Sequence, residues 1–512
     1  MTTMTNRTAM SNEPGLHALE AAEMNAENPE SRIIRRTSSL CPVCLKKIPA
    51  VLSRDTASDH SDKDNYTGNR SIVFMIKTCP QHGTFKVPVW KDNIDLEGWI
   101  SREEPLTERE DEFCSGDCRA CLDAGGVNPH GQETCCVILE VTKRCNLRCS
   151  YCFAHGGESE SQPSYGELCA AIDDIAKKGG GPLIQFSGGE PTLRDDLPDL
   201  VRYAGKAGCQ YTQINTNGIR LARDEDYVRK LAEAGLDIVF LQYDGTDDEI
   251  YRKLRGRALA QIKLQAIENC GKYRIGVTLV PTIVRGINDH AMGQIIREAV
   301  RRFPAVKSVH FQPVTYLGRH PERHPKDGHY TLDELMADLC SQTGIPESAL
   351  LPSRCDHAMC EFHSTFLVNS KRQLVPMTDR AHDVRRARTP ASRNRQYVAE
   401  HWRRDRSDTQ DEEKTEAEKI AAAEAASVKA ASAEAATVRA ADPGIPLVVT
   451  EKEEMGFDDF VRRMRTQTLK ISAMAFQDAM NVDLERLYRC SLHVYEDGQL
   501  LPFCGKYMTP WK

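Results

Sequence analysis

The chain has 512 residues, and its 67 lysines and arginines against 74 aspartates and glutamates give a formal net charge of −7. Because these charges nearly balance, no global field favours nucleic acid or an anionic membrane surface, and no nucleic-acid partner is expected. No run of about 18 apolar residues occurs, so nothing in this sequence is expected to span a bilayer.

The cysteine content and the N-terminal composition together indicate the compartment. The chain has 19 cysteines, and residues 1–36 are polar and lack the apolar core of a secretory signal. We expect residues 1–36 to be a disordered tail and the protein to be cytoplasmic, with peripheral contact at the membrane left open. In a reducing cytoplasm, clustered cysteines are metal ligands rather than disulfides.

Residues 37–125 form a predicted Cys-rich metal domain that begins with two knuckles. Cys41 and Cys44 make the first knuckle, and Cys79 and His82 make the second, about 35 residues later. Paired knuckles place four ligands tetrahedrally around one ion. The ion is either zinc, bound by all four side chains, or a rubredoxin-like mononuclear iron that takes a fourth cysteine from elsewhere. In both cases a structural role is favoured over catalysis.

A second cysteine group follows the knuckles. Cys114, Cys118 and Cys121 have the spacing C-x3-C-x2-C, and Cys135 comes shortly after them. Four thiolates would close all four irons of an auxiliary [4Fe–4S] cluster, which would act as an electron relay or a substrate anchor. The alternative is a second zinc site that includes His130.

The central loop repeats this spacing with Cys145, Cys149 and Cys152, directly after the apolar run Val137–Val141. Three soft thiolate ligands in one short loop suit a [4Fe–4S] cluster, and they leave its fourth iron without a protein ligand. The alternatives are a zinc site with His155 as the fourth ligand, a redox loop, or cysteines that are buried as small hydrophobic side chains.

Short apolar runs alternate with helical patterns across residues 126–315, which predicts parallel strands with crossover helices. Six such units would form an α/β fold, a partial (β/α)6 barrel of the TIM type, whose ligands bind at the C-terminal ends of the strands. The predicted strands are Val137–Val141, Leu183–Phe186, Thr212–Asn215, Ile238–Gln242, Val277–Pro281 and Ser308–Pro313.

Polar residues follow three of these strands and are predicted to contact a cofactor. Gly188 and Gly189 would let the backbone approach a ligand closely, and Glu190 would accept an ammonium group. Asn217 ends the third strand and Asp244 ends the fourth, where they could hold ribose hydroxyls or substrate. Turns of this kind also occur without any ligand.

The Cys145 loop, with Tyr151 before its last cysteine, resembles the signature of the radical S-adenosylmethionine (SAM) superfamily. The resemblance implies that the open iron binds the amino and carboxylate groups of SAM. It also implies that a low-potential donor such as ferredoxin or flavodoxin supplies an electron, and that a 5′-deoxyadenosyl radical then abstracts hydrogen from an unreactive C–H bond. The segment Gly188–Glu190 matches the part of the family that binds the methionine amine.

The C-terminal third carries the remaining cysteine groups. Cys355 and Cys360 follow the barrel, and Cys490 and Cys504 flank a predicted hairpin with an Asp-Gly turn at residues 497–498. These four cysteines could close a second auxiliary cluster, similar in outline to the hairpin-held clusters of many radical SAM enzymes. Residues 316–382 and 446–512 would form this domain, with a flexible Arg-rich and Ala/Glu-rich insertion at 383–445.

The ordered set of cysteine groups resembles the archaeal-type radical SAM subfamily of tetraether lipid synthases and a dihydropterin methylase. We favour C–C bond formation between lipid chains, with an apolar tunnel along Met464–Met480 and lipid contact through an Arg-rich loop. The alternatives are C-methylation of a dihydropterin and, in a different class, an iron–sulfur electron carrier. The predicted tunnel side chains are Leu469, Ile471, Met474 and Phe476, and the predicted lipid-contacting arginines are Arg403, Arg404 and Arg406.

Overall fold

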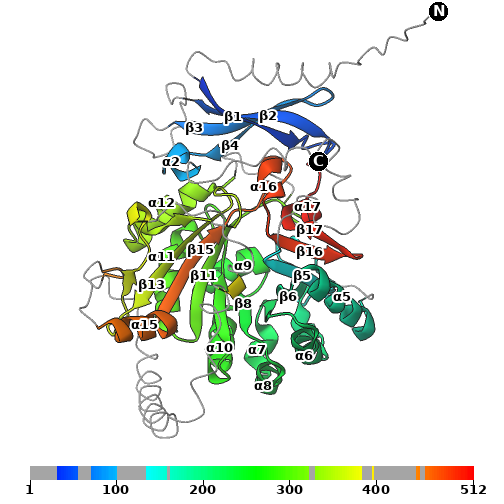
Figure 1. The fold of residues 1–512 in the computed structure, drawn as a ribbon, viewed down its shortest axis with the longest axis vertical. Coiled ribbons are helices and arrows are strands. Elements are labelled where there is room, and N and C mark those ends of the chain that lie inside the picture. Colours follow the sequence, from blue (N-terminus) through cyan, green and yellow to red (C-terminus); the bar gives the residue numbers. More distant parts are fainter. Residues whose placement is uncertain are drawn as a thin grey trace, which may run out of the picture.

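The computed structural model describes residues 31–55, 71–100, 134–157, 162–321, 329–353, 355–382, 395–396, 446–449 and 456–511 (Figure 1). Residues 1–30 of the predicted tail, the group formed by Cys114, Cys118, Cys121 and His130, and all but two residues of the insertion at 383–445 lie outside the described residues, whereas residues 31–36 of that tail belong to a β-strand.

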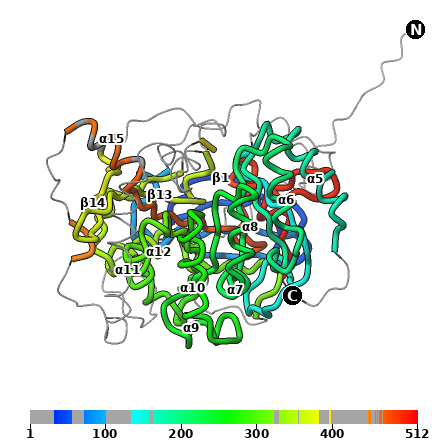
Figure 2. Tube along the Cα trace, turned by 90° about the horizontal axis from the view of Figure 1, so that it is seen from below, coloured from blue at the N-terminus to red at the C-terminus, as the bar shows by residue number. Residues whose placement is uncertain are grey.

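The six predicted strands form the parallel centre of one large sheet. Helices pack on its outer face, as the view from below shows (Figure 2). This arrangement confirms the predicted α/β barrel. The strands are β5 (Cys136–Thr142), β6 (Leu183–Gly188), β7 (Tyr211–Thr216), β8 (Ile238–Gln242), β9 (Gly276–Val280) and β11 (Val306–Pro313), and the helices that follow them include α5 (Tyr165–Lys178), α6 (Leu197–Ala207), α7 (Ile219–Arg223), α8 (Glu225–Ala234), α9 (Asp248–Arg255), α10 (Ala260–Lys272) and α11 (Met292–Arg301).

Helix α6 shows why the sequence folds in this way. Its buried residues Leu197, Leu200, Val201 and Ala204 recur at the spacing of one helical face, and that face packs into the main core. The helix ends at Gly208, which has the left-handed φ of 98° that glycine adopts without a side-chain penalty.

Strands from the C-terminal third extend this sheet at both edges. Next to β11 lie the parallel strand β15 (Thr468–Met474) and then the antiparallel strand β13 (Glu361–Val368). At the other edge, β16 (Leu492–Glu496) runs parallel to β5 and forms the predicted hairpin with β17 (Gln499–Pro502). In Figure 1 the orange β15 lies beside the green barrel strands. The C-terminal third therefore completes the barrel sheet.

The two edges of the sheet meet through one carboxylate. Asp356 follows β12 (Leu351–Pro352), which pairs with β13 at one edge. It accepts hydrogen bonds from the backbone N–H of Ser491 (2.7 Å) and from its hydroxyl (3.1 Å). Because Ser491 directly precedes β16, this contact, which we name the seam, closes the otherwise open sheet on itself.

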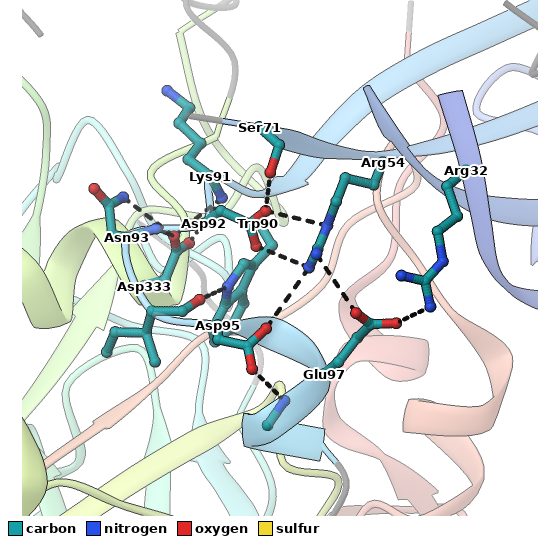
Figure 3. A network of polar contacts seen from close by, with 12 residues as sticks. Arg32, Arg54, Ser71, Trp90, Lys91, Asp92, Asn93, Asp95, Glu97 and Asp333 are labelled. Carbon is teal, nitrogen blue, oxygen red and sulfur yellow. Dashed lines mark hydrogen bonds and ion pairs between the residues drawn. The ribbon is translucent and has the colours of Figure 1, made fainter. Parts of the chain in front are cut away.

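The N-terminal region is a separate antiparallel sheet that docks on the barrel. Asp333, buried at the start of α12 (Leu332–Thr343), accepts the backbone N–H groups of Lys91 and Asn93 at 3.0 Å, and Arg54 lies between Asp92 and Glu97 (Figure 3). These contacts fix the sheet against α12. Its elements are β1 (Ser31–Leu40), β2 (Lys47–Asp55), β3 (Ile72–Cys79), β4 (Gly83–Trp90) and the short helix α2 (Leu96–Ile100).

The same sheet also holds the C-terminal segment. The hydroxyl of Thr37 donates to Asp483 (2.7 Å), and the hydroxyl of Ser39 donates to the carbonyl of Val482. Buried Lys77 donates to the carbonyl oxygens of Leu40 and Ala479, both at 2.9 Å. Residues 479–483 are thus tied to β1 and β3.

Of the helices in the part of the chain that the structure describes, none is long and apolar enough to cross a membrane.

Candidate active site

A cavity of about 890 Å³ opens inside the barrel and reaches the C-terminal ends of its strands. The three cysteines of the central loop and residues of the barrel strands form parts of its wall. The wall includes all of the predicted cofactor residues except Asp244, together with Cys135 and Cys355; the predicted members are Cys145, Cys149, Cys152, Gly188, Gly189, Glu190 and Asn217.

The central loop suits an iron–sulfur cluster better than a single ion. Burial first, then Glu190 and the thiols of Cys149 and Cys152, raise the pKa of Cys145 to about 12, so the three sulfurs lie close enough to interact. They are nevertheless not among the described groups whose ligand atoms all lie within 4.8 Å of one another. The His155 side chain is exposed and does not line the cavity. Three soft donors around a space larger than one ion fit a [4Fe–4S] cluster.

Arg319, which sequence reasoning missed, braces this loop. Its side chain donates to the carbonyl oxygens of Cys149 (3.0 Å) and Gly156 (3.1 Å), and its own carbonyl accepts the N–H of Cys152 (2.8 Å). Arg319 therefore satisfies these three backbone groups of the loop. No local pattern marks this arginine, because it lies about 170 residues from the loop it holds.

The two glycines after β6 approach the cluster loop. Gly188 has a φ of 115°, and the N–H of Gly189 donates to Thr142 O at 2.7 Å. A Cβ on Gly189 would lie 2.1 Å from the carbonyl oxygen of Arg144. The close backbone approach predicted from the sequence is thus made to the loop at 142–144, while both glycines still border the cavity.

Glu190 is buried and already accepts several hydrogen bonds. One oxygen accepts the N–H and hydroxyl of Thr192 (3.1 and 2.6 Å) and the hydroxyl of Thr216 (2.6 Å), and the other accepts the N–H of Asn217 (2.7 Å). A carboxylate offers about four acceptor sites, so only the second oxygen keeps room for a cationic ligand. Glu190 therefore orients the turns after β6 and β7.

Asn217 and Asp244 differ in their positions. Asn217 lines the cavity and donates from its side chain to Asn146 of the cluster loop (2.7 Å). Asp244 is fully buried, does not line the cavity, and forms a two-point ion pair with Arg255, both contacts at 2.7 Å. The carboxylate of Asp244, which was predicted to contact the cofactor, is engaged by an arginine 11 residues further along the chain and lies outside the cavity wall.

Arg255 brings a positive charge to the cluster loop. It lines the cavity at 5% exposure. Burial alone would lower its pKa, but the Asp244 carboxylate and the Cys149 thiol raise it above its usual value. Gln242 also approaches the Cys149 sulfur, at 3.9 Å. Positive charge and hydrogen bonds at a cluster sulfur tune the reduction potential of an iron–sulfur centre.

One part of the cavity wall, formed by β11, β13 and β15, is strongly polar, and we name it the polar wall. The ring nitrogen Nδ1 of His310 lies 2.8 Å from the hydroxyl oxygen of Ser472, and Nζ of Lys470 donates to the hydroxyl of Thr365 at 2.9 Å. Burial lowers the pKa of Lys470 to about 7 and that of His310 to about 4. The polar wall comprises His310 on β11, Lys470 and Ser472 on β15, and Glu361 and His363 on β13, all of which line the cavity.

Comparison with known proteins agrees with this site. Residues 139–299 match the model of the radical SAM superfamily, and residues 33–91 match the HMPTM N-terminal zinc ribbon domain. A 7,8-dihydro-6-hydroxymethylpterin dimethyltransferase of Methanocaldococcus jannaschii is 30% identical over 504 residues, covering 92% of each chain. This chain belongs to the radical SAM superfamily.

Other known proteins match shorter parts of the chain. Fe-coproporphyrin III synthase of Methanosarcina barkeri is 41% identical over 152 residues, 29% of this chain and 36% of that one. Among solved structures, a methylornithine synthase is similar at 16% identity and a TM-score of 0.33, covering 49% of this chain and 72% of that one. As a radical SAM protein, the chain is an enzyme that uses a [4Fe–4S] cluster and SAM.

The zinc ribbon of this radical SAM enzyme contains the predicted ion site. The ligand atoms of Cys41, Cys44, Cys79 and His82 all lie within 4.8 Å of one another. Nδ1 of His82 is 3.4 Å from the sulfurs of both Cys41 and Cys79. Three thiols and one imidazole that converge on a single point form a donor set suited to structural zinc. None of the four residues lines the large cavity.

The C-terminal cysteines are arranged differently from the prediction. Cys360, Cys490 and Cys504 surround a second, small cavity of about 20 Å³ beside the seam. Cys355 instead lines the large cavity, as Cys135 does, and both the Asp356 carboxylate and the Cys135 thiol contribute to the raised pKa of Cys355 after burial. The structure therefore brings together three of the four predicted ligands and places Cys355 with Cys135.

Proposed function

We propose that this radical SAM enzyme is a C-methyltransferase that acts on a dihydropterin. The observation that carries the proposal is the polar wall. A planar heterocycle whose edges are rich in hydrogen-bond donors and acceptors can satisfy polar groups such as Glu361, Lys470 and His310. The M. jannaschii relative, whose name specifies a dihydropterin and dimethyl transfer, supports this choice over nearly the full chain.

The polar wall also argues against the lipid-coupling function that the sequence favoured. Ile471, Met474 and Phe476 do line the cavity, but Lys470 and Ser472 alternate with them along the same segment. A hydrocarbon chain in this space would offer these polar side chains no hydrogen bond beyond those already made to Thr365 and His310, and each buried donor or acceptor left unsatisfied costs about 1–3 kcal/mol. None of the relatives named above is described as acting on a lipid.

The residues of the loop have assigned tasks in this proposal. Cys145, Cys149 and Cys152 hold the cluster, which together with SAM supplies the 5′-deoxyadenosyl radical when both are bound. Arg319 fixes the loop. Glu190 and Asn217 fix the turns around the space for the methionine end of SAM. A low-potential donor such as ferredoxin or flavodoxin provides the electron.

The test is an anaerobic reaction with reconstituted enzyme, SAM, a chemical reductant, a reduced-folate one-carbon donor that supplies the methyl carbon, and 7,8-dihydro-6-hydroxymethylpterin, followed by high-resolution mass spectrometry. We expect the pterin to gain one or two CH2 units alongside 5′-deoxyadenosine. A parallel reaction contains diether phospholipid vesicles in place of the pterin. An unchanged pterin together with a lipid that loses two hydrogens would restore the lipid-coupling function. The Cys149→Ala variant serves as the control without turnover.

A further inference from the structure

The C-terminal triad, which we define as Cys360, Cys490 and Cys504, has a carboxylate as its neighbour at the seam. The small cavity between these cysteines is also lined by Asp356 and Arg486, and Cys355 is not part of its wall. Asp356 lines the large reaction cavity as well, so its side chain stands between the two spaces.

The surroundings of the triad suit an anionic iron–sulfur cluster. Arg486 is buried, and its Nε donates to the sulfur of Cys360 at 3.4 Å. The N–H of Gln477 donates to the sulfur of Cys504 at 3.3 Å. A buried guanidinium group needs negative charge close by, and hydrogen bonds to sulfur are typical of cluster ligands. Like the Cys145 loop, the triad is not among the described groups that converge on a single ion.

Asp356 lies on the side of the triad that Cys355 was expected to occupy. Ser491, the residue after Cys490, donates to the Asp356 carboxylate from its backbone N–H at 2.7 Å and from its hydroxyl at 3.1 Å, so the carboxylate is held next to Cys490. The sulfur of Cys355 lies 3.6 Å from Oδ2 of Asp356, and Cys355 lines the large cavity together with Cys135. The carboxylate is therefore close to both Cys490 and Cys355, but of Asp356 and Cys355 only Asp356 borders the small cavity between the triad cysteines. The hydrogen bonds from Ser491 hold the carboxylate in place.

We propose that the triad and the carboxylate of Asp356 together hold an auxiliary [4Fe–4S] cluster with three thiolate ligands and one carboxylate ligand. Carboxylate oxygen is a harder donor than thiolate, and iron–sulfur clusters favour thiolates. The iron bound by Asp356 is therefore the most exchangeable of the four, and it is the one that faces the reaction cavity. The inference rests on the radical SAM part of the proposed function and is independent of the identity of the substrate.

The experiment compares variants of the full chain in a background in which Cys145, Cys149 and Cys152 are alanine, so that the catalytic cluster does not contribute. Iron and sulfide content, Mössbauer spectra, and EPR after mild oxidation are measured for Asp356→Asn, Asp356→Cys and Cys355→Ser. The parent protein should show one iron site that differs from the all-thiolate irons. Asp356→Asn should lose about one iron per chain on oxidation and show the EPR signal of a three-iron cluster.

The other two variants complete the test. Asp356→Cys should retain the full iron content with an all-thiolate Mössbauer spectrum and a lower reduction potential, and it decides the matter even if Asp356→Asn does not fold. Cys355→Ser should match the parent in the signals of the C-terminal cluster. Loss of those signals in Cys355→Ser, or unchanged spectra in both Asp356 variants, would overturn the proposal. Absence of pterin methylation in the wild-type enzyme would leave these spectra unaffected.

Discussion

The zinc ribbon and the Cys145 loop contain similar numbers of cysteines in similarly tight turns, yet the structure uses them in opposite ways. In the ribbon, four ligand atoms lie within 4.8 Å of one another and none borders the large cavity. In the loop, three thiols line that cavity without a fourth protein ligand among the residues that the structure describes. A closed ligand set stabilises a fold, whereas an open set faces a substrate.

The lesson of this comparison is that the position of a cysteine group relative to the cavity indicates its role better than the number of its cysteines. Residues 37 and 39 of β1 contact residues 482–483, so the ribbon supports the segment that leads to Arg486 and Cys490. The loop is itself supported by Arg319 and by the turn at Gly189. The zinc ribbon therefore stabilises a neighbouring segment, whereas the Cys145 loop is itself stabilised by neighbouring residues.

The largest effect is expected at the open site. Cys149→Ala should remove the cluster and reduce SAM cleavage to background, because two thiolates do not hold the cluster. The measurement is 5′-deoxyadenosine formation per chain under anaerobic conditions. Cys169→Ala is the matched control, since Cys169 lies on α5 and does not line the cavity. Full SAM cleavage by Cys149→Ala would disprove the assignment of the loop.

Loss of a ligand in the zinc ribbon should affect folding stability rather than SAM cleavage. Cys41→Ser should remove about one zinc per chain and destabilise the N-terminal sheet strongly, because structural zinc binding contributes about 10–16 kcal/mol to the folding of small zinc domains. Protease cleavage within residues 31–100 and the midpoint of thermal unfolding report this loss. SAM cleavage per loaded cluster should stay within about twofold. If SAM cleavage disappeared while the cluster remained loaded, the ribbon would participate in the reaction.

Arg255 places a positive charge beside the Cys145 loop. Arg255→Gln alone leaves the Asp244 carboxylate buried without its partner, which costs about 3–5 kcal/mol of folding free energy. The double variant Asp244→Asn with Arg255→Gln avoids that unpaired charge. The double variant removes one positive and one negative charge, but Arg255 is the member of the pair that interacts with the Cys149 sulfur, so its loss should lower the reduction potential of the cluster by about 50 mV, equivalent to about 1 kcal/mol. An EPR-monitored redox titration measures it, and an unchanged potential would contradict the role given to Arg255.

The sequence allowed the barrel and the grouping of cysteines in the central loop and the ribbon to be predicted because both depend on local patterns. Apolar runs mark strands such as β8, and cysteine spacing marks loops. The pairing of β15 between β11 and β13 was missed because these contacts join residues far apart in the chain. The same strand alternates polar and apolar residues, a pattern typical of one solvated face. Only the closed sheet shows that Lys470 and Ser472 face the cavity.

The smallest expected effect is a pH-dependent change in KM through Lys470, which faces the cavity. Burial lowers the pKa of Lys470 to about 7, so its ammonium form, the stronger hydrogen-bond donor, is lost as the pH rises through 7. The KM for the dihydropterin should therefore increase about fivefold between pH 6 and pH 8, a difference of about 1 kcal/mol between charged and neutral hydrogen bonds. Lys470→Met should show the higher KM at both pH values, and Lys206→Met on the exposed side of α6 should follow the wild type. A pH-dependent KM that persists in Lys470→Met would show that another group on the polar wall, rather than Lys470, contacts the substrate.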